Sequence, residues 1–398
     1  MFRLKTLADI PAVVGKRVIV RADLNVPSDG GRVMDATRIV RFAPTAKWLA
    51  DRGAKVVVIT HFGRPKGKSP EFSTGILVFD LAKALGIPVG FASDTIGPEV
   101  ESKIAAMRNG DVLLLENVRF YPEEEANDAG FSRELAALGD IYVNDAFSAA
   151  HRAHASTEGI AKYLPSYAGL LMTEEVDALA KALENPARPA LAIVAGSKVS
   201  TKLEVLANIS AKVDAMAIGG AMANTFLLAK GYGIGASMAE PDMAGIAEKI
   251  LARARESGCE IILPVDVCVA KELKENAEHK FVGADHVEGG WKIFDIGPET
   301  IRLFEDRLAK VKTVLLNGTV GVYETAPFNR GSIEIARAVA RLTKAGKLVS
   351  VAGGGDTVAS INQAGAADGF TYISTAGGAF LEWLEGKTLP AIVPLTEE

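Results

Sequence analysis

The strongest constraint on the fold of this chain is an alternation of short apolar runs with helical patterns. Runs of this kind are typical of strands buried on both faces of a sheet, and in the first part of the chain they lie at 17–21, 55–60, 112–116 and 141–144. Between them, 36–51 and 77–85 carry apolar residues at spacings of three and four, which predicts amphipathic helices. Strands that alternate with helices predict right-handed βαβ units on a parallel sheet.

The same alternation resumes after a break. We interpret 163–169 as a connection, 173–183 as a helix and 185–189 as a second boundary. Further strands are predicted at 190–195, 215–219, 260–264, 312–316, 347–352 and 371–374, with helices at 202–211, 244–256 and 333–344. A chain of 398 residues exceeds what one hydrophobic core usually serves, so we expect an α/β protein of two doubly wound lobes.

Composition excludes several classes of protein. With 48% hydrophobic and 23% charged residues the chain is an ordinary globular protein. No apolar run reaches the roughly 20 residues of a membrane helix, so no membrane partner is expected. A net charge of −5 argues against general nucleic-acid binding. The first residues lack a secretory signal, and Cys259 and Cys268 fit unpaired thiols in a reducing cytoplasm.

One stretch has the pattern of a phosphate site. An apolar run stops at Gly353, Gly354 and Gly355, and a helical pattern follows. Glycines let the backbone approach an anion, and the N–H groups of a helix's first turn point toward it. Asp356 could cap that helix or hold Mg²⁺, and Thr357 adds a hydroxyl. Taken alone, the stretch fits a plain tight turn equally well.

Polar residues follow the strands of the first lobe, where ligands of doubly wound sheets bind. They include five arginines: Arg21, Arg38, Arg64, Arg119 and Arg152. Any single one could be a solvated surface arginine. Five of them near strand ends, together with Asp23, Asn25 and His61, favour a pocket for a small polyanion, because guanidinium groups bind phosphate and carboxylate through two hydrogen bonds.

The second lobe carries lysines and glycines at its strand ends. The strand at 190–195 is followed by Gly196, Lys198 and Lys202. Two lysines four apart at a helix start lie on one face and could both reach phosphates, although two solvated helix lysines fit the spacing as well. The order of residues is not that of a Walker A loop. The segment 231–235 has glycines at alternate positions but follows a helix, so we interpret it as a loop.

Together these motifs resemble the phosphoglycerate kinase family along essentially the whole chain. The resemblance is carried by Arg21-Ala-Asp-Leu-Asn-Val-Pro27, His61-Phe-Gly-Arg-Pro65, Leu115-Glu-Asn-Val-Arg-Phe120, Asn144-Asp-Ala-Phe147, His151-Arg-Ala-His154, Gly353-Gly-Gly-Asp-Thr357 and Leu384-Glu-Gly-Lys387. It implies two Rossmann-like lobes joined by a helical hinge. The implied bounds are 1–172 for a glycerate-binding lobe, 173–186 for the hinge and 187–386 for a nucleotide-binding lobe, with the tail 387–398 packing back on the first lobe.

The resemblance also implies an activity. It is the reversible, Mg²⁺-dependent transfer of a phosphoryl group between 1,3-bisphosphoglycerate with ADP and 3-phosphoglycerate with ATP, by direct in-line transfer with hinge closure. The implied protein is a cytoplasmic monomer of glycolysis, gluconeogenesis or carbon fixation.

Site residues follow from the same resemblance. The glycerate would be bound by Asp23, Asn25, Arg38, His61, Phe62, Gly63, Arg64, Arg119 and Arg152. The nucleotide would be bound by Gly196, Lys198, Lys202, Gly219, Asn317, Glu324, Gly353, Gly354, Gly355, Asp356 and Thr357, with Glu324 on the ribose and Asp356 on the metal. The residues at the transferring group would be Arg38, Lys198, Gly354 and Gly377.

This chain departs from the usual family pattern near the nucleotide. It has Leu316 and Thr319 where the family usually has Trp and Pro, and Ala376 where a glycine is usual. A nucleotide-binding protein that has lost catalysis is therefore one alternative. Another is a nicotinamide-dependent dehydrogenase, which the doubly wound lobes would allow, although no Gly-x-Gly-x-x-Gly follows a strand.

Overall fold

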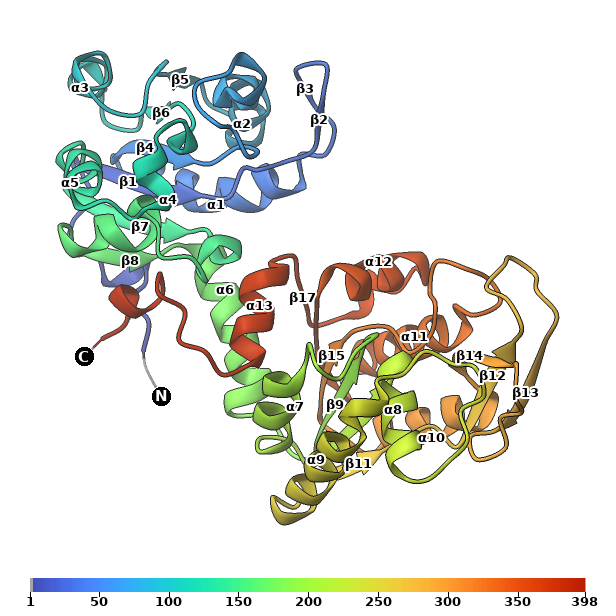
Figure 1. The fold of residues 1–398 in the computed structure, drawn as a ribbon. Coiled ribbons are helices and arrows are strands. Elements are labelled where there is room, and N and C mark those ends of the chain that lie inside the picture. The colour runs from blue at the N-terminus through green and yellow to red at the C-terminus, as the bar shows by residue number, and fades with distance from the viewer. Residues whose placement is uncertain (1–2, 398) are drawn as a thin grey trace. The chain divides into compact units, whose positions relative to one another are not determined.

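A computed structural model describes residues 3–397 of the chain (Figure 1). The chain forms two compact units: Met1–Val176 with Thr388–Glu398, called the N-terminal unit, and Asp177–Lys387, called the C-terminal unit. Each unit is built on a six-stranded sheet in which all paired strands are parallel. The predicted α/β fold with two parallel sheets is confirmed.

The sheet of the N-terminal unit has the strand order β5-β6-β4-β1-β7-β8. Its strands are β1 (Arg17–Ala22), β4 (Lys55–Thr60), β5 (Val89–Phe91), β6 (Val112–Leu114), β7 (Ile141–Asp145) and β8 (Ser166–Ala168). A small hairpin joins β2 (Ser28–Asp29) to β3 (Arg32–Val33). Strand β4 pairs with β1 on one side, and β7, which comes later in the chain, pairs with β1 on the other side. The order of the strands therefore reverses beside β1. Ligands of doubly wound sheets bind at such a reversal.

Helices cover both faces of this sheet. They are α1 (Thr37–Asp51), α2 (Val78–Leu85), α3 (Pro98–Ala106), α4 (Pro122–Glu125), α5 (Ala129–Ala137) and α6 (Leu170–Leu179), the last of which continues into the C-terminal unit. Alternate residues of β1 point to opposite faces. Val18 and Val20 pack in one core cluster with Phe42 of α1, whereas Ile19 packs in another with Leu135 of α5. This burial on both faces explains the continuous apolar run in the sequence.

The C-terminal unit has the strand order β11-β10-β9-β15-β16-β17, with the strand reversal between β9 and β15. Its strands are β9 (Ala190–Ala195), β10 (Ala215–Gly219), β11 (Glu260–Ile262), β15 (Thr313–Asn317), β16 (Val349–Gly353) and β17 (Tyr372–Ser374). A separate antiparallel sheet contains β12 (Asp266–Ala270), β13 (His279–Gly283) and β14 (Lys292–Ile296). The helices of the C-terminal unit are α7 (Leu203–Ser210), α8 (Ala221–Ala229), α9 (Ala244–Glu256), α10 (Pro298–Leu308), α11 (Arg330–Lys344), α12 (Gly355–Gln363) and α13 (Gly377–Leu384).

Several strands of the structure were not predicted from the sequence. The segment 163–169, interpreted as a connection, contains β8, which pairs with β7. The prediction also lacked β5 and the antiparallel sheet of β12, β13 and β14. β5 and β8 have three residues each, too few positions for a periodic signal. The strands β12, β13 and β14 have five residues each, so their length does not explain why the prediction lacked them. The helix predicted at 173–183 is α6 followed by a π-helical turn at Ala180–Glu184.

The two chain ends lie side by side on the N-terminal unit, near β8 in Figure 1. The backbone N–H of Lys5 donates to the carbonyl of Leu395 over 2.7 Å, and Ala168 N–H donates to Lys5. Residues 388–397 therefore complete the N-terminal unit. Of the helices within residues 3–397, none has the length and apolar character that crossing a membrane requires.

Candidate active site

Arg21, at the carboxyl end of β1, is the centre of the polar cluster in the N-terminal unit. Its side chain is only 1% exposed. The guanidinium donates through Nε to Ser156 Oγ over 2.8 Å and through Nη1 to the carbonyl of Ala22. Its Nη2 lies 3.1 Å from Nδ1 of His61. A buried cation is tolerated only when it is well hydrogen-bonded, and these contacts meet that condition.

The contact with Arg21 determines the form of His61. A guanidinium has no acceptor, so Nδ1 of His61 must accept the hydrogen bond and carry no proton. Burial lowers the pKa of His61 well below its ordinary value, and the charges of Arg21, Arg119, Arg152 and Arg38 lower it further. His61 is therefore a neutral ring with its proton on Nε2. It is a hydrogen-bond donor that adds no further positive charge.

A fully buried carboxylate, that of Glu124, is connected to Arg21 through Ser156. Glu124 of α4 accepts from the backbone N–H of Ser156 over 2.8 Å and from its hydroxyl over 2.6 Å. Ser156 thus links the buried guanidinium to the buried carboxylate. Burial raises the pKa of Glu124, while the nearby charge of Arg21 opposes that rise. Burial also lowers the pKa of His154, beside Glu124, to about 4, so this histidine is neutral as well.

Three side chains hold the loop that follows β4. Asn25 accepts from the backbone N–H of Gly63 over 2.8 Å, and Arg119 donates to the carbonyl of Gly63 over 2.7 Å. Asn117 donates to the carbonyl of Phe62 over 2.7 Å and accepts from its N–H over 3.2 Å. The strand ends of β1, β4 and β6 are therefore tied together. Such a scaffold keeps the side chains around it in fixed positions.

Asp23 connects the strand end to the first helix. Its carboxylate accepts hydrogen bonds from Arg38 of α1 and from the hydroxyl of Ser148. The same carboxylate accepts from the backbone N–H of Asn25 over 3.2 Å. Arg38 is thereby turned toward the carboxyl edge of the sheet, where its charge reaches His61.

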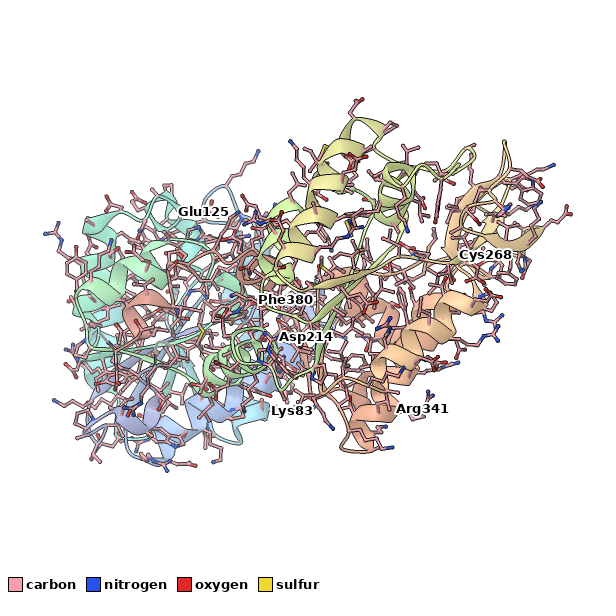
Figure 2. All side chains as sticks on the ribbon, turned by 90° about the horizontal axis from the view of Figure 1, so that it is seen from below. Lys83, Glu125, Asp214, Cys268, Arg341 and Phe380 are labelled. Carbon is pink, nitrogen blue, oxygen red and sulfur yellow. The ribbon has the colours of Figure 1, made fainter. Side chains whose placement is uncertain are left out.

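The structure brings together most of the residues predicted for a polyanion pocket. Arg119 also carries an ion pair with Glu125, 3.2 Å from Nε to Oε1, and Figure 2 labels Glu125 on this unit. Burial lowers the pKa of Arg119, and the neighbouring Arg152 contributes. Arg64, by contrast, is exposed in the loop after β4. Positive charge in excess of its partners, at an edge built from strand ends, is suited to a small ligand with several negative charges.

In the C-terminal unit the glycine stretch does form a helix N-terminus. Helix α12 begins at Gly355, the last of the three glycines, and Gly354 is its N-cap with φ 101°. Gly318 has φ 107°, and a Cβ there would lie 1.9 Å from the carbonyl oxygen of Ala195. The hydroxyl of Thr357 accepts from the backbone N–H of Gly318 over 2.7 Å. These contacts pack the loop after β15 against the start of α12.

Lys202 contacts the strand ends next to the junction between the loop after β15 and the start of α12. Its ammonium donates to the side chain of Asn317 over 2.6 Å and to the carbonyl of Ala195 over 2.7 Å. Asn317 in turn donates to the carbonyl of Gly353 over 3.0 Å. Burial lowers the pKa of Lys202 to about 8, and the charge of Asp356 acts in the opposite direction. A cation is thus held where three strand ends, β9, β15 and β16, meet.

The prediction that Lys198 and Lys202 share one helix face is wrong. Helix α7 begins at Leu203, so Lys202 is its N-cap residue and Lys198 lies in the preceding loop. The carbonyl of Lys198 accepts from the hydroxyl of Thr201, and Ser200 donates to Glu240 over 2.6 Å. Hydroxyl groups at these two positions favour turns over a helix. Lys198 is exposed, whereas Lys202 is largely enclosed.

A cavity of about 720 Å³ lies beside this junction. Of the residues predicted for a nucleotide, Gly196, Glu324 and Asp356 line it. Apolar side chains also line it, among them Met238 and Phe294. Gly219 lies at the end of β10 next to the lining residue Gly220. Gly377 begins α13, and a Cβ there would meet open space. The mixture of apolar walls and a few polar groups is typical of a small-molecule site.

The carboxylates at this cavity match one mode of metal binding. Within residues 3–397, no three His, Cys, Asp or Glu side chains are grouped as a metal site. Asp356 is exposed in the first turn of α12. A single carboxylate is sufficient for Mg²⁺ when phosphate oxygens and water supply the other ligands. The residues present therefore fit a metal that arrives with a phosphate ligand.

Several residues that contact the polar cluster carried no signal in the sequence. Glu124 lies in a run of three glutamates, a pattern typical of solvent-exposed side chains, yet it is 0% exposed. Ser156 and Ser148 are single hydroxyls in the segment after β7, and only the folded chain places them beside Arg21 and Asp23. Asn117 was visible only as part of a motif, and its role in holding the loop after β4 comes from the structure.

Comparisons with known proteins agree on one family. A family model described as phosphoglycerate kinase matches residues 7–387. A phosphoglycerate kinase of Mesorhizobium japonicum is 56% identical over 393 residues, which cover 98% of this chain and 99% of the relative. One from Methylorubrum extorquens (strain PA1) is 54% identical over 396 residues, 99% of both chains. The solved structure of phosphoglycerate kinase from Coxiella burnetii has a TM-score of 0.92 at 41% identity and covers 99% of both chains.

Proposed function

Because the chain belongs to the phosphoglycerate kinase family and is a phosphotransferase, we propose that its N-terminal unit binds the glycerate and its C-terminal unit binds Mg-ADP or Mg-ATP. The reaction is the reversible transfer of a phosphoryl group between 1,3-bisphosphoglycerate with ADP and 3-phosphoglycerate with ATP. Direct in-line transfer, hinge closure, a cytoplasmic location and a monomeric state belong to this proposal.

In the N-terminal unit we assign the glycerate to the cluster around His61. The ring would donate from Nε2 to a ligand oxygen, because Arg21 occupies Nδ1. Arg119 and Arg152 would pair with the 3-phosphate, and the exposed Arg64 would reach it from the loop. Asp23 and Asn25 would orient the hydroxyl and carboxyl groups. Phe62 and Gly63 would supply the backbone of the loop that closes this end of the sheet.

In the C-terminal unit we assign the nucleotide to the cavity of about 720 Å³. Glu324 would accept from the ribose hydroxyls, and the apolar walls would hold the base. The N-terminus of α12, with Gly353, Gly354 and Gly355, would bind phosphate oxygens through backbone N–H groups. Asp356 would hold Mg²⁺, which neutralises phosphate charge when bound. Lys202, Asn317 and Thr357 would keep the strand ends in place around it.

The reaction itself needs charge neutralisation more than acid–base chemistry. When 3-phosphoglycerate is the acceptor, its carboxylate is already ionised near neutral pH, so no base has to remove a proton. The neutral state of His61 is consistent with that. Negative charge on the transferred group's oxygens must be stabilised during transfer. Arg38 and Lys198, with the backbone at Gly354 and Gly377, would supply that stabilisation.

The observation that carries this proposal is the convergence of Arg21, Arg38, Arg119 and Arg152 on one neutral histidine. A coupled assay with 3-phosphoglycerate and Mg-ATP tests it, with expected turnover in the ordinary range of metabolic kinases. The control omits 3-phosphoglycerate and measures ATP hydrolysis alone. If ATP is consumed equally with and without the glycerate, or not at all, the assignment of both substrates fails.

A further inference from the structure

A second cavity in the C-terminal unit lies along the outer edge of its sheet. Its volume is about 430 Å³, within the range of small-molecule sites. Strand β11 at the sheet edge forms one wall, and helices α8 and α9 form another; these three elements lie together in Figure 1 in yellow tones. Pro264 lines both this edge cavity and the cavity assigned to the nucleotide. The two cavities therefore share a wall but have different remaining linings.

The charges around the edge cavity are unbalanced. Two acids line it: Glu260 forms a two-point ion pair with Arg307 at 2.7 Å, whereas Asp285 lies 2.6 Å from His286, a ring that is charged only when protonated. Two cations line it as well, Lys230 and Arg255. Among residues 3–397, no carboxylate forms an ion pair with either of them. Two cations, Lys230 and Arg255, therefore face one carboxylate, Asp285, that no permanent cation neutralises, which leaves the cavity with an excess of one positive charge.

Part of the wall of the edge cavity is apolar. Leu227, Leu251 and Leu263 line it, and the ring of Tyr232 lies 5.3 Å from the ammonium of Lys230. Cys259 is buried at its wall. Burial raises the pKa of that thiol to about 11, so the sulfur carries no charge near neutral pH. An apolar part of the wall next to two cations suits a ligand that has an apolar body and one anionic group.

We propose that the edge cavity is a second binding site, for a small organic anion whose apolar body contacts Leu227, Leu251 and Tyr232 and whose acidic group pairs with Lys230 and Arg255. Both cations also lie at helix C-termini, where positive charge complements the helix dipole. A helix-terminal role alone predicts a change in stability when they are removed and no change in ligand preference. The two roles can therefore be measured separately.

The test compares two fluorescent probes of nearly the same shape. Anilinonaphthalene sulfonate carries the anionic group, and phenylnaphthylamine lacks it. The wild-type protein should bind the sulfonate at least tenfold more tightly than the neutral amine. The double variant Lys230→Ala/Arg255→Ala should bind both probes alike. A matched control, Lys249→Ala/Arg253→Ala, removes two exposed cations of α9 that do not line the cavity and should behave as wild type.

Further measurements test whether the probes bind in the edge cavity. Leu251→Trp should fill it and abolish probe binding, with folding checked by thermal melting. Saturating Mg-ADP should leave the sulfonate bound, since the nucleotide cavity is separate. Retention of the tenfold preference by the double variant, its loss in the control, or displacement by Mg-ADP would each overturn the proposal. Phosphoryl transfer should continue in both double variants, and its absence in the wild type would refute only the proposed function.

Discussion

The guanidinium of Arg21 donates a hydrogen bond to Nδ1 of His61 over 3.1 Å, inside the N-terminal unit. This contact makes His61 a donor at Nε2 and keeps it neutral among several cations. A protonated ring at this place would repel the four arginines whose charges already lower its pKa. The contact between Arg21 and His61 therefore keeps a hydrogen-bond donor, Nε2 of His61, in a basic pocket without adding charge.

We predict that His61 stays neutral in the folded protein across the pH range in which an ordinary histidine takes up its proton. Long-range proton–nitrogen NMR spectra of the ring should show an unprotonated Nδ1 and a protonated Nε2 throughout. In the urea-unfolded chain the same ring should titrate near its ordinary value of 6.5. Because only the unfolded state takes up this proton, the contribution to stability is present above about pH 6.5 and is lost as pH falls. A protonated Nδ1 at neutral pH would contradict the assigned tautomer.

Arg38 provides the second prediction. Arg38→Ala should lower kcat about 1000-fold while leaving the affinity for Mg-ADP nearly intact, because the guanidinium is expected to act on the transferring group and not on the nucleotide. Steady-state kinetics and calorimetry check the two parts separately. Arg52→Ala is the matched control, since Arg52 lies at the far end of α1 and stacks on Trp48. Most of the turnover remaining in Arg38→Ala would rule out this role.

The strand ends could be predicted from sequence because parallel topology fixes where they meet. Asp23, His61 and Arg119 follow β1, β4 and β6, and each β-branched run identified its strand. Glu124 could not be predicted as part of the site. Its burial depends on Ser156, which lies 32 positions along the chain, and nothing in the local Pro-Glu-Glu-Glu pattern distinguishes it from its solvated neighbours.

Lys198 and Lys202 of the C-terminal unit show a case in which residue spacing predicted the wrong local structure. Their spacing of four predicts a shared helix face only if both lie in a helix. The turn around Ser200 and Thr201 delays the start of α7 to Leu203, so spacing carries no information about Lys198. Lys202 is placed by its contact with Asn317, which comes from a strand more than a hundred positions away.

The lowered pKa of Lys202, about 8, leads to the third prediction. If nucleotide phosphates lie near this ammonium, binding should restore its proton. At about pH 8.5 the binding of Mg-ADP should then take up roughly 0.7 proton. Calorimetry in buffers of different ionisation enthalpy measures this uptake. Lys202→Met should abolish it, and Lys198→Met, which removes an exposed lysine, should not. Equal proton uptake in both variants would exclude Lys202 as its source.

Asp356 is the residue that we propose to hold Mg²⁺ in the C-terminal unit. It is the carboxylate in the first turn of α12 and lines the cavity assigned to the nucleotide. Asp356→Asn keeps the size of the side chain but removes the charge that a divalent cation requires. We therefore expect Mg-ADP to bind at least tenfold more weakly, while ADP measured in the presence of a chelator binds as to the wild type or slightly better, because one negative charge near the phosphates is gone. Calorimetry with and without Mg²⁺ separates the two effects, and Glu334→Gln, a change at a half-buried carboxylate of α11 that pairs with Arg337, serves as the charge-matched control. An affinity for Mg-ADP equal to that of the wild type would place the metal elsewhere.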